Sequence, residues 1–125
     1  MNRGKILLID DNEEDLIFTK ELLEKVGYTV IQNVGWLGTT KNIKYLNPDI
    51  VLLDVNMPAL PGDKLYDLVL NLVKEKKIPV LFYSAMDESY LKKLKIMKGI
   101  TDYIVKGDIF QLYRKLSLYM NRKLN

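Results

Sequence analysis

Aspartates stand at the ends of two apolar runs in this sequence. Asp54 closes the run at residues 49–54, and Asp10 and Asp11 follow directly after the run at 5–9. Runs of this length that are rich in Ile, Val and Leu are typical of strands buried on both faces of a parallel sheet. Open α/β sheets bind their ligands at the carboxyl ends of the strands. We therefore expect these carboxylates to meet at one edge of a sheet.

Three carboxylates at one edge repel one another unless they take up protons or bind a cation. A set of oxygen ligands with one open side suits Mg²⁺. Such a set also suits phosphoryl transfer, because a carboxylate can form an acyl phosphate while a metal neutralises the transferred oxygens. We expect Asp54 to be the nucleophile, since a buried strand holds it rigidly. Asp11 would then ligate Mg²⁺, and Asp10 would do so directly or through water.

Ser84 and Lys106 follow two further apolar runs nearer the C-terminus. Right-handed crossovers bring the carboxyl ends of parallel strands to the same edge of a sheet, so both side chains are expected near Asp54. A lysine cation and a hydroxyl donor can stabilise the remaining oxygens of a phosphoryl group. Each residue alone has a simpler explanation, as a helix cap, a turn residue or a solvated charge. The ordered set favours a phosphoryl site.

Composition excludes several other kinds of chemistry. The 125 residues include no cysteine and no histidine, which rules out disulfides, thiolate catalysis, Ser-His-Asp catalysis and histidine metal sites. The net charge of +3, from 19 basic and 16 acidic residues, is too small to argue for direct nucleic-acid binding. The sequence shows neither a signal peptide nor a membrane-spanning run, so we expect a cytoplasmic protein without membrane insertion.

Strand-like and helix-like segments alternate along the chain, which predicts one α/β domain with a parallel sheet covered by helices. Strands are expected at residues 5–9, 28–33, 49–54, 79–83 and 102–105, and helices between Asn12 and Gly27, at 36–46, 63–75 and 88–98, and from 108 onward. The helix at 36–46 has the weakest pattern, because Gly38 and the two threonines after it are poor helix formers. The helical pattern places Ile17 and Leu68 among the positions that face the core.

Four motifs, taken in order, resemble those of the receiver (CheY-like) domain of two-component response regulators. They are Ile9-Asp10-Asp11-Asn12, Leu52-Leu53-Asp54-Val55-Asn56-Met57-Pro58, Ser84-Ala85 and Asp102-Tyr103-Ile104-Val105-Lys106. The resemblance covers essentially the whole chain and describes residues 1–125 as a single receiver domain. It implies a flavodoxin-like, doubly wound sheet of five parallel strands in the order 2-1-3-4-5, flanked by about five helices.

The resemblance also implies how the site would work. Asp54 would accept a phosphoryl group from a histidine kinase or a histidine phosphotransfer protein, with Lys106 beside that group. Asp11, Asp54 and the backbone carbonyl of Asn56 would hold Mg²⁺, and Asp10 would reach the ion through water.

Ser84 and Tyr103 correspond to the switch pair of the family. In that pair the hydroxyl moves onto the phosphoryl group and the aromatic ring turns inward. A downstream target protein would read this change on the face made by the helix at 88–98, the strand at 102–105 and the last helix. A phosphorylation-dependent homodimer is another use of that face.

Two alternatives and one departure accompany this interpretation. An aspartyl-nucleophile phosphatase or phosphotransferase of the haloacid dehalogenase class has an acid two residues after the nucleophile, where this chain has Asn56. A pseudo-receiver, which binds without being phosphorylated, typically lacks an acidic or lysine position that is present here. Gly107 replaces the proline that usually follows the lysine of the family, which makes that loop more permissive.

We therefore expect a phosphorylation-controlled signalling switch rather than an enzyme. The chain ends at Asn125, just beyond the last predicted helix, as single-domain regulators of chemotaxis and phosphorelays do. A trimmed piece of a longer regulator would have the same sequence.

Overall fold

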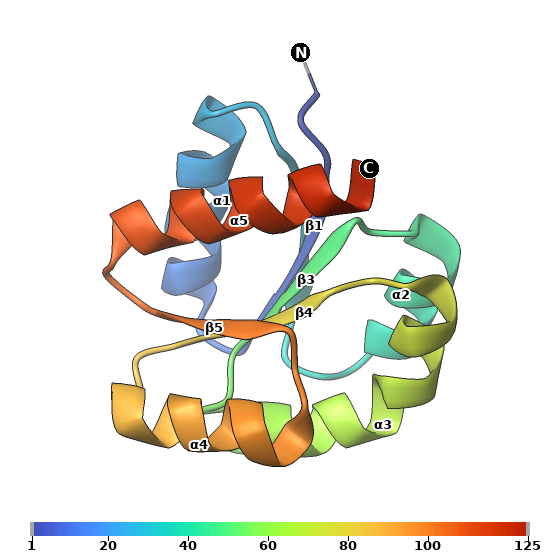
Figure 1. The fold of residues 1–125 in the computed structure, drawn as a ribbon, viewed down its shortest axis with the longest axis vertical. Coiled ribbons are helices and arrows are strands. Elements are labelled where there is room, and N and C mark those ends of the chain that lie inside the picture. Colours follow the sequence, from blue (N-terminus) through green and yellow to red (C-terminus); the bar gives the residue numbers. More distant parts are fainter. Residues whose placement is uncertain (1, 125) are drawn as a thin grey trace.

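The computed structural model describes residues 2–124, in which five strands and five helices alternate (Figure 1). Their bounds, in chain order, are β1 (Lys5–Asp10), α1 (Glu13–Lys25), β2 (Thr29–Val34), α2 (Thr39–Leu46), β3 (Ile50–Leu53), α3 (Gly62–Lys76), β4 (Val80–Ser84), α4 (Glu88–Lys98), β5 (Asp102–Val105) and α5 (Ile109–Leu124). All strands pair in parallel, in the order β2-β1-β3-β4-β5, which confirms the predicted doubly wound fold. None of the helices in the described residues is long and apolar enough to cross a membrane.

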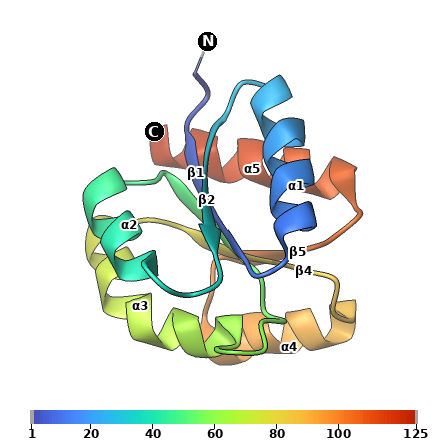
Figure 2. The same ribbon diagram turned by 180° about the vertical axis from the view of Figure 1, so that it is seen from behind.

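The sheet lies between two layers of helices, with α1 and α5 on one face and α2, α3 and α4 on the other (Figures 1 and 2). Alternate side chains of β1 enter the two cores: Ile6 and Leu8 pack under α1 and α5, while Leu7 and Ile9 pack under the other three helices. Every side chain of β3 is buried. The apolar runs are therefore strands with both faces covered, as their composition predicts.

Helix α1 begins and ends where its residues predict, but one expected core position on α1 and one on α3 are wrong. The Asn12 side chain accepts a hydrogen bond from the backbone N–H of Asp15, at 3.1 Å, as an N-cap. Ile17 is 55% exposed, because Leu16 already faces the sheet and the next residue points about 100° away from it. Leu68 on α3 is 70% exposed for the same reason.

Helix α2 begins at Thr39, three residues later than predicted, because a turn precedes it. Gly35 and Gly38 have φ angles of 71° and 84°, in the left-handed region that favours glycine. The buried side chain of Asn33 holds this turn by donating to the carbonyls of Gly35 at 2.7 Å and Leu37 at 3.0 Å. Gly38, which weakens the helical pattern, therefore belongs with Gly35 to a defined turn.

The strand register brings the polar strand ends together. Ile9 of β1 lies beside Leu53 of β3, and the backbone N–H of Asp54 donates to the carbonyl of Ile9 at 2.9 Å. On the other side of the sheet Ser84 lies beside Val105, directly before Lys106. The carboxyl edge of the sheet therefore gathers Asp10, Asp54, Ser84 and Lys106, which the sequence predicts for the site.

Candidate functional site at the carboxyl edge of the sheet

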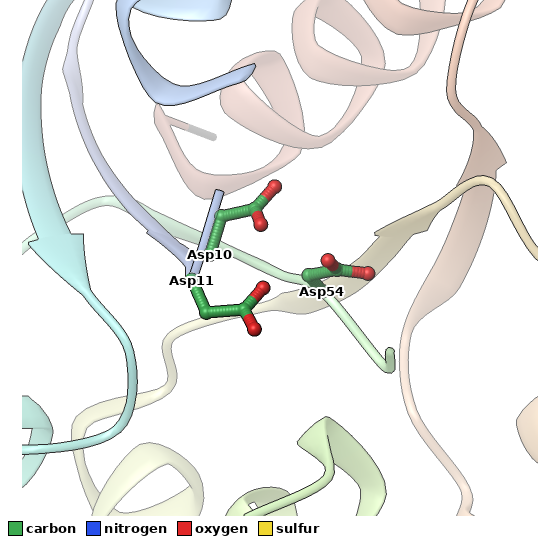
Figure 3. Close-up of side chains that lie close together, drawn as sticks. All are labelled: Asp10, Asp11 and Asp54. Atoms are coloured by element: carbon green, nitrogen blue, oxygen red, sulfur yellow. The ribbon is translucent and has the colours of Figure 1, made fainter. Parts of the chain in front are cut away.

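The carboxylates of Asp10, Asp11 and Asp54 point into one space at this edge (Figure 3). Each offers one oxygen, and these oxygens lie within 4.8 Å of one another. Asp10 and Asp54 are almost fully buried, whereas Asp11 is exposed. The predicted convergence of the three side chains is confirmed.

Asp54 is held firmly by its surroundings. Its Oδ1 accepts a hydrogen bond from the backbone N–H of Asn56 at 3.1 Å. The start of α3 also packs against its backbone, because a Cβ atom on Gly62 would lie 2.0 Å from the Asp54 carbonyl oxygen. A side chain at position 62 would push this carbonyl away, so glycine is required where α3 approaches the strand end.

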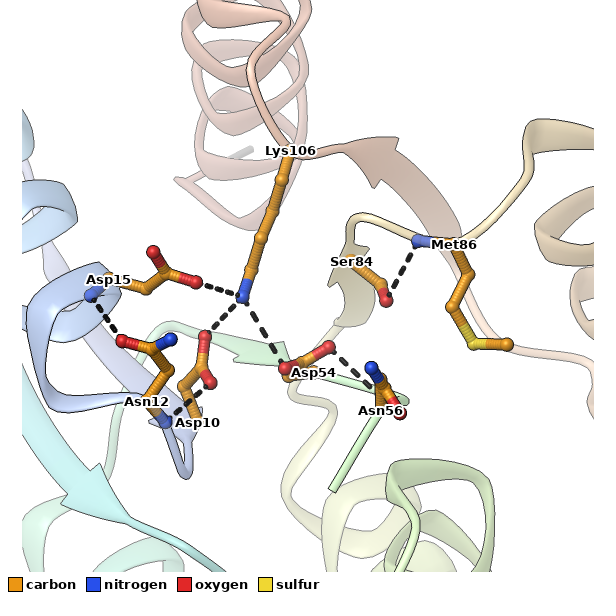
Figure 4. A network of polar contacts seen from close by, with 8 residues as sticks. All are labelled: Asp10, Asn12, Asp15, Asp54, Asn56, Ser84, Met86 and Lys106. Atoms are coloured by element: carbon orange, nitrogen blue, oxygen red, sulfur yellow. Dashed lines mark hydrogen bonds and ion pairs between the residues drawn. The ribbon is translucent and has the colours of Figure 1, made fainter. Parts of the chain in front are cut away.

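Lys106 reaches into the same space and contacts three carboxylates (Figure 4). Its Nζ lies 2.5 Å from an oxygen of Asp10, 2.9 Å from Asp15 and 3.4 Å from Asp54. The ammonium also lies 5.9 Å from the centre of the Tyr83 ring, within cation–π range.

Asp15 is a partner of Lys106 that the sequence did not predict as a site residue. A signal for it in the sequence is its place in the first turn of α1, which begins just after Asp10 and Asp11.

Charge is unbalanced in this cluster. Burial raises the pKa of Asp54 to about 6; the charge of Lys106 opposes this shift, and the charge of Asp10 adds to it. Burial on its own would lower the pKa of Lys106, but its hydrogen bonds with Asp10 and Asp15 and the charge of Asp54 outweigh that effect and raise it. One ammonium therefore faces several carboxylates, which leaves a negative site that favours a further cation.

The arrangement fits a small divalent cation. Mg²⁺ holds oxygen ligands at about 2.1 Å, so its ligands lie no more than about 4.2 Å apart. The 4.8 Å limit on the carboxylate oxygens is close to this value, and small side-chain movements would close the difference. A pocket opens beside these oxygens and is lined by Asp11, Asn12, Asp15, Asp54, Asn56, Pro58, Ala85 and Lys106.

Ser84 lies across Asp54 from Lys106 and is fully buried (Figure 4). Its Oγ accepts a long hydrogen bond, at 3.4 Å, from the backbone N–H of Met86. The backbone N–H of Lys106 donates to the Ser84 carbonyl at 2.8 Å, which ties the ends of β4 and β5 together. The hydroxyl therefore lies at the rim of the same space as the Asp54 carboxylate and is held there only weakly.

Tyr103 lies in the face formed by α4, β5 and α5. Its hydroxyl donates to Glu88 at the start of α4, at 3.0 Å. The ammonium of Lys115 lies 4.5 Å from the centre of its ring and donates to its carbonyl at 2.6 Å. The structure thus places the Tyr103 ring between Glu88 and Lys115; no pattern in the sequence pointed to these two contacts.

Asp102 is the centre of a second charged cluster, at the start of β5. Its carboxylate accepts hydrogen bonds from the Tyr119 hydroxyl at 2.6 Å, the Tyr103 backbone N–H at 2.8 Å and the Lys115 ammonium at 3.1 Å. Lys95 adds an ion pair at 3.5 Å. Burial would raise the pKa of Asp102, but the hydrogen bonds, from Tyr119 first, outweigh it and lower the pKa.

Gly107 allows a turn in the loop after Lys106. Its φ angle is 96°, and the backbone N–H of Asp108 donates to the Val105 carbonyl at 3.1 Å to close a turn. Proline, which is restricted to a φ near −65°, cannot adopt this conformation. The loop therefore follows a path that the usual proline of the family would not allow.

Comparisons with known proteins agree with this geometry. Residues 6–116 match the family described as the response regulator receiver domain. The chain is 35% identical over 103 residues to the CAI-1 autoinducer sensor kinase/phosphatase CqsS of Vibrio cholerae, covering 82% of this chain and 15% of that protein. It is 33% identical over 108 residues to the alkaline phosphatase synthesis transcriptional regulatory protein PhoP of Bacillus subtilis, covering 85% of this chain and 43% of that protein. The chain thus spans less than half the length of either relative.

A similar solved structure is the Francisella response regulator 1452 receiver domain, with a TM-score of 0.83 and 25% sequence identity. The superposition covers 95% of this chain and 98% of that one.

Proposed function

Because the chain belongs to the response regulator receiver family, we propose that it is a phosphorylation-controlled signalling switch in which Asp54 accepts the phosphoryl group. Receiver domains of this family interact with histidine kinases and with downstream effector domains. The observation that carries the proposal is the meeting of Asp10, Asp11 and Asp54 at one sheet edge, with the Lys106 ammonium among them.

The transfer step follows from the position of Asp54. One of its carboxylate oxygens attacks the phosphorus of a phosphohistidine on the donor protein and forms a P–O bond. The P–N bond breaks, and its electron pair stays on the imidazole nitrogen. The imidazole leaves as a neutral group, because its other ring nitrogen already carries a proton. The Lys106 ammonium and the Ser84 hydroxyl, on either side of Asp54, donate hydrogen bonds to the phosphoryl oxygens.

Magnesium is the cofactor that this site would take. The side chains of Asp11 and Asp54 and the backbone carbonyl of Asn56 would hold the ion, and Asp10 would reach it through water. When bound, the ion supplies positive charge that neutralises the phosphoryl oxygens and the carboxylates around them. Without it, the negative charge of the site opposes the approach of an anionic donor.

The output of the switch would pass through Ser84 and Tyr103. A phosphoryl group on Asp54 would draw the Ser84 hydroxyl toward it by a charge-assisted hydrogen bond, and the Tyr103 ring would turn into the vacated space. Only a partner with different affinities for the two states can sense this change. We expect that partner, a target protein or a second copy of this chain in a phosphorylation-dependent dimer, on the face of α4, β5 and α5.

The same proposal places residues 1–125 in a single receiver unit that works in the cytoplasm without binding nucleic acid directly. Its donor would be a histidine kinase or a histidine phosphotransfer protein. A pseudo-receiver or an aspartyl phosphatase would have the same fold, so labelling is what separates the three functions.

Intact-mass measurement after incubation with acetyl phosphate tests the proposal. We expect one phosphoryl addition to the wild type in Mg²⁺, none after chelation, and none in Asp54→Asn. Asp67→Asn, which removes an exposed carboxylate on α3, is the matched control and should be labelled like the wild type. Turnover of the donor without a lasting adduct would indicate a phosphatase. An unlabelled wild type, or labelling of Asp54→Asn at the wild-type rate, would refute the proposal.

A further inference from the structure

Asp15 is a carboxylate that the proposed function leaves without a role. It lies outside the group of Asp10, Asp11 and Asp54, yet its oxygen is 2.9 Å from the Lys106 Nζ, whereas the nearest Asp54 oxygen is 3.4 Å away (Figure 4). The ammonium is thus drawn toward α1 and away from the residue that is proposed to carry the phosphoryl group.

The helix cap holds the backbone of Asp15 in a position from which its side chain reaches Lys106. Asn12 caps α1 by accepting the Asp15 N–H at 3.1 Å, so the cap and the lysine contact involve adjoining groups of the same residue. The backbone N–H of Asn12 in turn donates to Asp10 at 3.0 Å, which joins the cap to the other strong partner of Lys106. The start of α1 therefore presents Asp15 to Lys106 in a defined position.

Asp15 differs from the other two partners of Lys106 in exposure. Its side chain is 45% exposed, against 3% for Asp10 and 6% for Asp54. Water can replace the ammonium at an exposed carboxylate at low cost, whereas a buried carboxylate left unpaired is expensive. Of the three contacts of Lys106, the one to Asp15 is therefore the easiest to break.

The hydrogen-bonding capacity of lysine makes these contacts competitive. An ammonium group has three N–H donors, and here all three are directed to carboxylates, those of Asp10, Asp15 and Asp54. Close approach to a phosphoryl oxygen on Asp54 moves the ammonium away from α1. The contact with Asp15 lengthens or is lost in that movement.

We infer that Asp15 is a positioning residue that holds Lys106 on the α1 side of the pocket and competes with the phosphoryl group for its ammonium. In this role Asp15 acts through Lys106. It biases the switch toward the unphosphorylated state, in which the Lys106 contact with Asp54 stays long. This inference rests on the proposed role of Asp54 as the phosphoacceptor.

Three variants separate this role from a general effect of charge. Asp15→Asn removes the anionic acceptor, and Asp15→Glu keeps the charge and can restore the contact. Glu13→Gln removes the same charge from an exposed residue of the same helical turn and is the matched control. The probe is beryllofluoride with Mg²⁺, an analogue of the phosphoryl group, and its affinity is measured by titration of amide resonances.

We expect Asp15→Asn to bind beryllofluoride about two- to fivefold more tightly than the wild type, the range of an exposed ion pair. Asp15→Glu should return toward the wild-type affinity. Glu13→Gln should change it by less than half as much. Equally tighter binding in Asp15→Asn and Glu13→Gln would show an effect of charge without positioning. Weaker binding by Asp15→Asn would show that Asp15 assists the phosphoryl state. Either result overturns the inference.

The ammonium resonance of Lys106, observed by ¹⁵N NMR in the metal-free protein, provides a readout independent of phosphorylation. It should move or broaden in Asp15→Asn and stay in place in Glu13→Gln. An unchanged resonance in both variants would overturn the contact itself. Failure of the wild type to bind beryllofluoride would instead refute the proposed function, while the resonance would still show whether Asp15 holds Lys106.

Discussion

Two charged clusters of this molecule are built from the same groups in opposite proportions. At the carboxyl edge of the sheet, the ammonium of Lys106 faces the carboxylates of Asp10, Asp15 and Asp54. At the start of β5, the carboxylate of Asp102 faces two ammonium groups and the hydroxyl of Tyr119. The Lys106 cluster has an excess of negative charge, and the Asp102 cluster has an excess of positive charge.

The pKa values of the two buried acids show what this difference means. The pKa of Asp54 is raised to about 6, whereas that of Asp102 is lowered. Both groups are desolvated; burial prevails at Asp54, whereas the hydrogen bonds to Asp102, from Tyr119 first, outweigh it. A carboxylate that keeps a raised pKa in the fold is ready for a further cation, while one with a lowered pKa already has its partners and stabilises the protein. We therefore expect chemistry at the first cluster and a stabilising role for the second.

Asp102→Asn should have the largest effect on stability. The substitution removes the anionic acceptor of Tyr119 and Lys115, which are largely buried. We expect the free energy of unfolding to fall by about 2–3 kcal/mol, because buried donors lose their partner. Urea denaturation at neutral pH measures this loss. Asp108→Asn, at an exposed acid whose cap on the Gln111 N–H asparagine can keep, should stay close to the wild type. An equal loss in both variants would refute the stabilising role.

Asp54→Asn should increase the stability of the protein when Mg²⁺ is absent, in contrast to Asp102→Asn. The folded pKa of about 6 lies above the ordinary 3.8, so the folded protein binds more protons than the unfolded chain between these pH values. The contribution of Asp54 to stability therefore falls as pH rises from about 4 to 6 and remains unfavourable at pH 7. We expect the metal-free variant to be more stable than the wild type by about 1–2 kcal/mol at pH 7, a lower figure than the full shift because the group is coupled to its neighbours.

The pH profile checks this explanation. The stability difference between Asp54→Asn and the wild type should vanish near pH 4 and grow toward pH 7, in urea melts with chelator. Asp11→Asn should show a smaller gain, because Asp11 is exposed. If both variants are clearly less stable than the wild type, these carboxylates are structural hydrogen-bond partners and the contrast between the clusters fails.

The effect of low pH on stability should differ between the Asp102 cluster and the Asp54 cluster. Because the folded pKa of Asp102 is lowered, its contribution is fully present above the ordinary pKa near 4 and is lost as pH falls through the folded value. The stability difference between the wild type and Asp102→Asn should therefore shrink as pH falls below about 4. A difference that stays constant over this range would mean that packing, and not charge, stabilises the cluster.

Glu88→Gln should have the smallest effect. The exposed contact between Glu88 and the Tyr103 hydroxyl should contribute less than about 0.5 kcal/mol to stability. The ring resonances of Tyr103 should nevertheless shift, since one of its two holding contacts is weakened. Asp87→Asn provides the matched control, because the neighbouring Asp87 carboxylate accepts from Ser89 instead. Ring resonances that are unchanged in Glu88→Gln would show that this contact does not hold Tyr103.

Much of this protein could be predicted from its sequence, because the decisive signals are local. Apolar runs specify the buried strands, and the alternation of strands and helices specifies the sheet with its two layers. Parallel strands must end at one edge, so the meeting of Asp10, Asp11 and Asp54 followed from the positions of those residues at the ends of runs. The roles of Asp54, Lys106, Ser84 and Tyr103 in phosphorylation stay predictions.

Tertiary structure alone decided which charges pair. The partners of Lys106 lie 91, 96 and 52 residues away in the chain, and those of Asp102 are set by the packing of α4 and α5 on β5. Burial of Ile17 and Leu68 was mispredicted for a related reason, because a periodic pattern does not say how wide a stripe of each helix the sheet covers. Ion pairing depends on distances of a few ångströms between distant segments, and only the assembled fold sets those distances.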